Sequence, residues 1–183
     1  VLLPLQNVSN ELGAMLIAGC PLRSTEGKPF LGALILRPEQ PITVYRKRFV
    51  HPREEEYFQA SDDVVACSFC EARVGIAICA DIHNPQHPED TSKLGADIYA
   101  AGVAITPNGI GEAESNLSAI AHRYGMLTVM ANYASSTGDY PVAGRSAIWN
   151  EQGQVVAQTD GTGEFLVIAE GTPDGWCGSV ERV

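Results

Sequence analysis

The chain has 183 residues, of which 45% are hydrophobic and 19% are charged, a balance typical of a globular domain of this length. Its formal net charge of −10 opposes binding to nucleic acid or to an anionic membrane, because attraction to phosphate requires a basic face. No stretch approaches the roughly 18 consecutive apolar residues of a membrane-spanning helix. The N-terminus also lacks the basic lead-in and cleavage site of a signal peptide, so we expect none.

The hydrophobic pattern predicts one domain over residues 1–183 in which helices fall between buried strands. In the first half we expect a helix over 2–12 and strands over 15–19, 30–36, 42–45, 64–69 and 73–79. In the second half we expect helices over 88–94 and 112–124 and strands over 98–103, 127–131, 147–149, 155–157 and 165–169. Residues 171–183 show no periodicity and are predicted to be a C-terminal extension, ordered only where it docks. The pattern indicates α/β layers with mixed sheets.

The chain has an odd number of cysteines, Cys20, Cys67, Cys70, Cys79 and Cys177. An odd number argues against a disulfide scaffold and for a reducing compartment, so we expect a cytoplasmic protein. Cys67 and Cys70 form a C-x-x-C pair, which is half of a four-ligand zinc site, and no second pair completes it. The pair spans the end of a predicted strand and a turn, so we expect a structural role. A zinc or redox protein built on this pair is the alternative.

Cys79 ends a buried strand, in the uncharged run G-I-A-I-C that precedes Asp81. Open α/β sheets carry reactive groups at the carboxyl ends of their strands. The backbone N–H groups of a following helical turn have no partner within that turn and can bind an oxyanion. Taken alone, this stretch favours a buried structural cysteine, since cysteine is among the most buried residue types, and a functional Cys79 is the alternative. Asp81 is expected to cap or orient the turn.

Three segments together resemble the nitrilase superfamily, the carbon–nitrogen hydrolases. They read Y-R-K at 45–47, E-E-E-Y-F at 54–58 and G-I-A-I-C-A-D at 75–81, and G-A-D-I-Y at 95–99, A-N at 131–132 and G-R-S at 144–146 follow. The resemblance extends from about residue 19 to residue 170. It implies an α-β-β-α sandwich of two mixed sheets with outer helices, which pairs across its helices into a dimer or larger homo-oligomer. It also implies a small-molecule amide, N-carbamoyl compound or nitrile as substrate, with no cofactor and no metal.

The resemblance also implies roles for individual residues. Cys79 would be the nucleophile that forms a thioester, and Lys47 with the backbone N–H of Ala80 would stabilise the oxyanion. Besides its general base, the family has a second glutamate eight positions after the lysine, and the residue at that position here is Glu55. Glu54 and Glu56 are the alternatives if the loop is shifted by one residue.

One departure from the family concerns its general base, a glutamate that follows an apolar strand far upstream of the lysine. The glutamates before Lys47 are Glu11, Glu26 and Glu39, and none of them ends a predicted buried strand. We therefore expect an N-terminally incomplete sandwich that lacks the first strand–helix portion. A non-catalytic binding or assembly module is the alternative function.

Several other polar residues are weaker candidates. Tyr57, Asn108 and Asn132 are candidate substrate contacts, and Arg145 is a candidate structural residue. His83 and His87 lack a third metal ligand at a sensible spacing, so we expect exposed loop histidines and no metal site.

Overall fold

The structure is a computed structural model that describes residues 2–183. The helices are α1 (Leu3–Leu12), α2 (Gln86–Lys93) and α3 (Ile110–Tyr124), and a short 3-10 turn spans Cys79–His83. The strands are β1 (Leu16–Leu22), β2 (Phe30–Leu36), β3 (Thr43–Arg46), β4 (Ala66–Phe69), β5 (Ala72–Ile78), β6 (Ile98–Val103), β7 (Leu127–Asn132), β8 (Ala147–Trp149), β9 (Val155–Gln158), β10 (Phe165–Thr172) and β11 (Gly175–Arg182). No helix within the described residues is long and apolar enough to cross a membrane.

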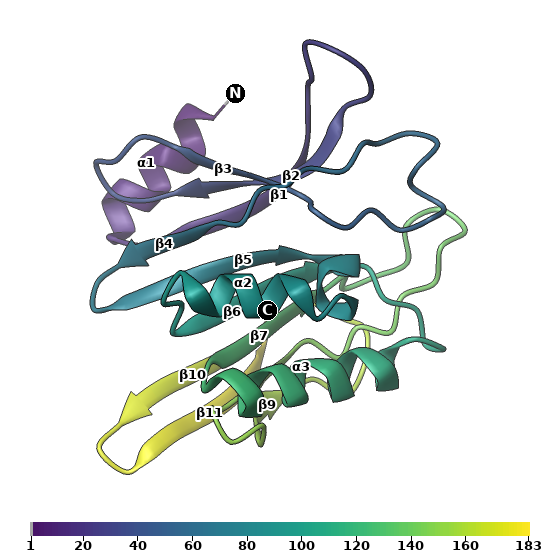
Figure 1. Ribbon diagram of the computed structural model, residues 1–183. Coiled ribbons are helices and arrows are strands. Elements are labelled where there is room, and N and C mark those ends of the chain that lie inside the picture. Colours follow the sequence, from purple (N-terminus) through teal and green to yellow (C-terminus); the bar gives the residue numbers. More distant parts are fainter. Residues whose placement is uncertain (1) are drawn as a thin grey trace.

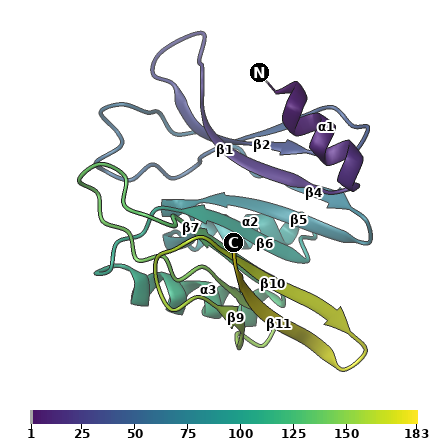
Figure 2. The ribbon, with the colours of Figure 1, turned by 180° about the vertical axis from the view of Figure 1, so that it is seen from behind.

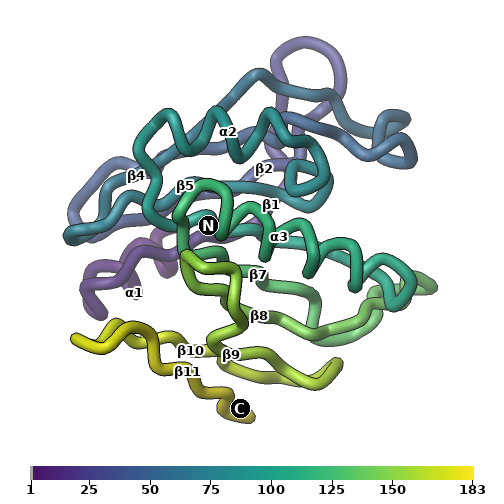
Figure 3. The backbone as a smooth tube through the Cα atoms, turned by 60° about the horizontal axis from the view of Figure 1, so that its bottom comes forward, coloured from purple at the N-terminus to yellow at the C-terminus, as the bar shows by residue number. Residues whose placement is uncertain are grey.

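The strands form two packed sheets and a separate hairpin. One sheet has the order β1-β2-β3, and the other has the order β4-β5-β6-β7-β8-β9. In the larger sheet β5, β6 and β7 are parallel, whereas the remaining pairs are antiparallel. Helix α1 packs on the smaller sheet, and α2 and α3 cover the outer face of the larger one (Figures 1 and 3). This arrangement confirms the predicted α-β-β-α sandwich, in which the larger sheet is mixed and the smaller one is antiparallel throughout.

Two apolar cores hold the layers together. The core between the sheets contains Ala33, Ile35, Tyr45, Cys67, Val74 and Ile76. The core under the helices includes the buried stripe of α3, formed by Ala113, Leu117, Ile120 and Ala121. Gly125 ends α3 in a left-handed conformation with φ of 62°, as its position after the stripe predicts.

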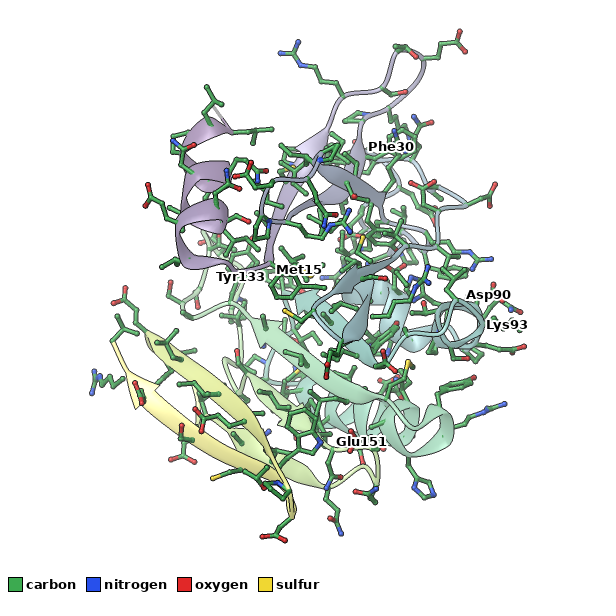
Figure 4. All side chains as sticks on the ribbon, turned by 90° about the vertical axis from the view of Figure 1, so that its left-hand side faces the viewer. Met15, Phe30, Asp90, Lys93, Tyr133 and Glu151 are labelled. Carbon is green, nitrogen blue, oxygen red and sulfur yellow. The ribbon has the colours of Figure 1, made fainter. Side chains whose placement is uncertain are left out.

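The C-terminal tail, predicted to be an extension that is ordered only where it docks, forms a regular strand. β11 pairs along its whole length with β10, and the resulting hairpin packs against β9 (Figure 2). Every residue of β11 is exposed, so the strand carries no apolar–polar alternation that a sequence pattern could reveal. The indole N–H of Trp176 donates to Glu151, which is labelled in Figure 4, and this contact anchors the hairpin.

Candidate active site

Cys79 lies where β5 ends and the 3-10 turn begins. Its φ is 46°, one of four positive values among the non-glycine residues that the structure describes. A residue with a side chain adopts this conformation at an energetic cost, and such residues cluster at functional sites. The thiol is partly exposed, and Ala80 follows within the same turn. We call residues 78–81 the nucleophile turn, after the role that the sequence predicts for Cys79.

Lys47 follows directly after β3, and its side chain is completely buried. Its backbone N–H donates to the carbonyl of Leu31 at 2.8 Å, which continues the pairing of the sheet past the end of β3. The Nζ atom lies 2.5 Å from Oε2 of Glu54, whose side chain is 28% exposed. A buried ammonium group requires a partner of this kind, because an unpaired charge in the interior is strongly unfavourable.

The carboxylate that reaches Lys47 therefore belongs to Glu54, the alternative assignment, and not to Glu55. Oε2 of Glu54 also accepts the backbone N–H of His51 at 2.8 Å, which fixes it within a compact turn. Glu55 is exposed, and its backbone carbonyl accepts a hydrogen bond from Lys28. Glu56 is exposed as well.

Asp81 connects the nucleophile turn with the segment that carries Lys47. Its Oδ2 accepts the N–H of Ile78 at 2.8 Å and the hydroxyl of Tyr45 at 2.6 Å. Its Oδ1 accepts the N–H of Phe49 at 2.9 Å. We call residues 45–49 the lysine segment. Since Tyr45 and Phe49 flank Lys47, one fully buried carboxylate holds both segments together.

A buried chain of side chains extends from Asp81 into α2. The Nε2 atom of His87 lies 2.9 Å from the Tyr45 hydroxyl, and Nδ1 lies 2.8 Å from the Tyr99 hydroxyl. Because Tyr45 donates its only hydroxyl proton to Asp81, its oxygen can only accept from His87. Nε2 of His87 therefore carries the proton and donates it to the Tyr45 hydroxyl. The Tyr99 hydroxyl then donates to Nδ1. Burial lowers the pKa of His87 despite the nearby Asp81, and burial raises the pKa of Tyr45 and of Tyr99.

The expectation that His87 is an exposed loop residue is wrong. Helix α2 begins at Gln86 and not at Pro88, since proline is tolerated in the first turn of a helix. The side chains of His87, Pro88 and Thr91 therefore face the sheet and are buried. His83 is exposed, as predicted.

A second link between α2 and the lysine segment lies at the surface. Arg48 forms an ion pair with Asp90 at 2.8 Å, and Lys93 reaches the other oxygen of Asp90 at 3.1 Å. Asp90 and Lys93 neighbour each other on α2 in Figure 4. The hydrogen bonds from Arg48 and Lys93 lower the pKa of Asp90 to about 2.

Of the remaining candidates, Asn132 ends the parallel strand β7, Asn108 lies on the loop after the parallel strand β6, and Tyr57 lies on the loop between β3 and β4. The amide group of Asn132 bonds to the backbone of Ile105, Tyr133 and Gly144, so it organises these loops with all of its polar atoms. Tyr57 is 61% exposed on the turn that carries Glu54, and Asn108 is exposed before α3.

Arg145 makes a two-pronged ion pair with Glu114 of α3. Its Nε and Nη2 atoms lie 2.7 and 3.1 Å from the two carboxylate oxygens of Glu114. This contact raises the pKa of Arg145, and it supports the structural role that the sequence suggested. Gly144 precedes Arg145 with a φ of 64°.

The C-x-x-C pair is divided between two environments. Cys67 is buried in β4, whereas Cys70 is exposed in the turn before β5. Within residues 2–183, no three side chains of His, Cys, Asp or Glu form a group that could hold a metal ion.

Sequence reasoning missed the chain formed by Tyr45, His87 and Tyr99. The available signal was the occurrence of tyrosines within strands predicted to be buried. A buried tyrosine hydroxyl usually finds a hydrogen-bond partner, so each of these residues implied a second polar group in the core.

Three solved structures resemble this fold at low sequence identity. They are an amidase from Nesterenkonia sp. AN1 (18% identity, TM-score 0.78), Saccharomyces cerevisiae Nit3 of the nitrilase superfamily (18%, 0.79) and glutamine-dependent NAD+ synthetase from Acinetobacter baumannii (20%, 0.80). The matches cover 87%, 86% and 94% of this chain and 64%, 60% and 35% of the respective structures. Other structures of the amidase contain butyramide, or carry the acetamide moiety of fluoroacetamide bound covalently at the active-site cysteine.

One curated relative is similar at the level of sequence. The glutamine-dependent NAD(+) synthetase of Thermotoga maritima is 22% identical over 156 residues, which are 81% of this chain and 27% of the relative. The chain thus spans about a quarter of that relative and less than two thirds of each structure named above. The model of the family described as "Carbon-nitrogen hydrolase" matches residues 1–176. The chain belongs to the carbon–nitrogen hydrolase family.

Proposed function

We propose that this protein hydrolyses a small amide through a thioester on Cys79. The observation that carries the proposal is the Asp81 carboxylate, which bonds both the nucleophile turn and the lysine segment. It supports an arrangement in which the strained Cys79 and the buried Lys47 serve one reaction centre. Thiolate is the strongest nucleophile among the side chains, which suits attack on an amide carbon.

The reaction has two halves. The Cys79 thiolate attacks the carbonyl carbon, and negative charge develops on the carbonyl oxygen, where Lys47 and the N–H of Ala80 stabilise it. The loss of one such donor typically raises the barrier by about 3–4 kcal/mol. The C–N bond then breaks, the nitrogen leaves with a proton as ammonia or an amine, and a thioester remains. Water hydrolyses the thioester to the acid and restores the thiol.

In this scheme Glu54 is the residue that pairs with Lys47 and orients it. Its carboxylate accepts a hydrogen bond from Nζ of Lys47 and so compensates the buried positive charge. It also fixes the direction of the ammonium group, which a preorganised oxyanion site requires. Glu54 takes over the role that the spacing of eight positions suggested for Glu55.

Amides are favoured over nitriles and N-carbamoyl compounds as the substrate class. The support comes from the names of the relatives, which describe an amidase and glutamine-dependent synthetases. A panel of aliphatic amides and glutamine, with matched nitriles and N-carbamoyl amino acids, tests this order through ammonia release. Faster turnover of the nitriles than of the amides would show that nitriles are the preferred substrate class.

A specific observation favours a second function, that of a non-catalytic binding or assembly module. Within residues 2–183, no side chain hydrogen-bonds the thiol of Cys79, and Glu54 is the only carboxylate bonded to Lys47. A general base contributes about 10²–10⁴-fold to such reactions. The 183-residue chain is therefore expected to turn over amides at near-background rates while Cys79 still reacts with iodoacetamide.

The natural full-length protein separates the two functions. Release of ammonia that the Cys79→Ser variant abolishes supports the hydrolase. If the full-length protein releases no ammonia from any compound of the panel, and iodoacetamide labels Cys79 no faster than the four other cysteines, the hydrolase proposal is wrong and the module remains.

A further inference from the structure

We propose that Asp81 is a positioning residue, which sets the nucleophile turn against the lysine segment and uses the buried Tyr45 as its second anchor. The inference rests on the roles proposed above for Cys79 and Lys47, and it adds the residue that holds them in register. Asp81 makes no hydrogen bond to the thiol of Cys79 or to the ammonium group of Lys47. Its action is therefore indirect.

The first argument is the number and origin of its donors. The carboxylate accepts one N–H from the strand end before Cys79, at Ile78, and two bonds from the lysine segment, at Tyr45 and Phe49. Asp81 is completely buried, so water cannot replace a lost bond at this point. The buried hydroxyl of Tyr45 would remain unsatisfied, the partly buried N–H groups of Ile78 and Phe49 would lose their partner, and the two segments would separate to regain partners.

The second argument is the strain at Cys79. A positive φ at a residue with a side chain persists only when the surrounding structure imposes it. Asp81 belongs to the same 3-10 turn as Cys79 and bonds back to the N–H of Ile78, the residue before the cysteine. This bond closes the turn around Cys79. Release of the Asp81 side chain would allow the backbone to relax and would redirect the thiol.

The third argument is the fixed direction of the buried chain behind Asp81. Tyr99 donates to His87, His87 donates to Tyr45, and Tyr45 donates to Asp81. All four side chains have 0% relative exposure. The hydroxyl of Tyr45 therefore has a single orientation, and α2 and β6 support the position of Asp81 from behind. Small displacements of a catalytic group matter, since about 1 Å can cost about 10²-fold in rate.

The test is the isosteric variant Asp81→Asn in the natural full-length protein. Whichever way the amide group is turned, its NH2 faces at least one N–H donor, so at least one bond is replaced by repulsion. We expect kcat to fall by about 10²-fold and KM to change by less than about threefold. Tyr45→Phe removes one of the three bonds and should reduce kcat by about tenfold. If Asp81 were merely a structural contact, the variants would lose thermal stability but would not combine a lower kcat with a nearly unchanged KM.

The matched control is Asp97→Asn. The carboxylate of Asp97 accepts the N–H of Arg73 at 2.7 Å, at the opposite end of β5 from Cys79. It is thus an aspartate just before β6 that bonds to the backbone of β5 away from the site. This variant should retain the kcat of the natural protein. An equal loss of kcat in Asp97→Asn would overturn the proposal.

A second readout does not depend on turnover. The rate of alkylation of Cys79 by iodoacetamide, relative to that of the exposed Cys70 in the same molecule, should fall about tenfold in Asp81→Asn. Amide hydrogen exchange at Ile78 and Phe49 should accelerate in the same variant. If Asp81→Asn fails to fold, Tyr45→Phe has to show a smaller change in the same direction.

These readouts separate the two proposals. If the full-length protein hydrolyses no amide, the proposed function fails, and the alkylation ratio and the exchange rates still test the positioning role. If amides are hydrolysed and Asp81→Asn or Tyr45→Phe leaves kcat, the alkylation ratio and exchange unchanged, Asp81 is not a positioning residue.

Discussion

The ammonium group of Lys47 lies 2.5 Å from the carboxylate of Glu54, and the lysine side chain has no exposed surface. A lysine on the solvent side of a loop needs no such partner. The complete burial of Lys47 next to a single carboxylate indicates that this lysine does not serve solubility.

Replacement of Glu54 tests this pairing. Glu54→Gln retains the shape of the side chain and removes the charge that compensates Lys47. We expect the free energy of unfolding to fall by about 1–3 kcal/mol, less than for a fully buried pair because Glu54 is 28% exposed. Urea unfolding at neutral pH measures it.

The neighbouring glutamate provides the control. Glu55→Gln changes an exposed side chain and should remain within about 0.5 kcal/mol of the natural chain. Equal losses in the two variants, or no loss in Glu54→Gln, would contradict the assignment of Glu54 to Lys47.

The comparison of Glu54 with Glu55 marks a limit of sequence reasoning. Strands such as β2 and β6 have the predicted bounds, because unbroken apolar runs can only be buried. The loop between β3 and β4 carries three consecutive glutamates, so composition does not distinguish them. The local turn, with the N–H of His51 donating to Glu54, selects the residue that faces the lysine.

The buried network was beyond prediction for a related reason. Helix α2 starts at Gln86 and has Pro88 within its first turn, whereas the sequence pattern placed Pro88 at the start of the helix. A shift of two residues moves His87 from a loop into the core. The position of Cys79 at the end of a buried strand was predictable because an unbroken apolar run precedes it, whereas Lys47 was singled out by the family resemblance alone.

The buried His87 makes stability depend on pH. Burial lowers its pKa in the folded chain below the ordinary value of 6.5, with Arg48 adding to this effect and Asp81 and Asp90 opposing it. Below about pH 6.5 the unfolded chain therefore binds a proton that the folded chain resists. The contribution of His87 to stability is complete above this pH and is lost as the pH falls, by up to about 1.4 kcal/mol per unit.

The measurement is urea unfolding between pH 8 and pH 5 for the natural chain and for His87→Gln. The difference between the two stabilities should shrink as the pH falls. The matched variant His122→Gln changes an exposed histidine of α3 and should retain the pH dependence of the natural chain. A difference that does not change with pH would show that His87 is not a buried neutral residue.

Gly144 is expected to be irreplaceable by alanine. Its φ is 64°, and a Cβ atom there would lie 2.1 Å from the carbonyl oxygen of Gly161, a backbone atom that cannot move aside. Gly144→Ala should lower the free energy of unfolding by about 2 kcal/mol or more. Gly111→Ala, in α3 with no atom near its Cβ position, should be neutral or stabilising by up to about 1 kcal/mol. Similar denaturation midpoints for the two variants would refute this explanation.

Self-association is expected from the apolar surface of α1. Leu3 and Leu12 are 74% and 70% exposed, and β1 is an edge strand of its sheet, with Ile17 42% exposed. Such surfaces and open strand edges favour contact with a second copy. Light scattering of the 183-residue chain should give a dimer or larger.

A double variant locates the association surface. Leu3→Gln with Leu12→Gln should shift the population toward the monomer, whereas Leu166→Gln, at an exposed position of β10, should not. A monodisperse monomer of the unmodified chain would exclude the association.

The most direct test of the central claim is mass spectrometry of the full-length protein quenched during turnover of a small amide such as butyramide. A thioester mechanism predicts an acyl group on the peptide that contains Cys79, and on no peptide that contains Cys20, Cys67, Cys70 or Cys177. The acyl group should disappear in Cys79→Ser together with ammonia release. Ammonia release that continues in Cys79→Ser, or an acyl group on another cysteine, would contradict the assignment of Cys79 as the nucleophile.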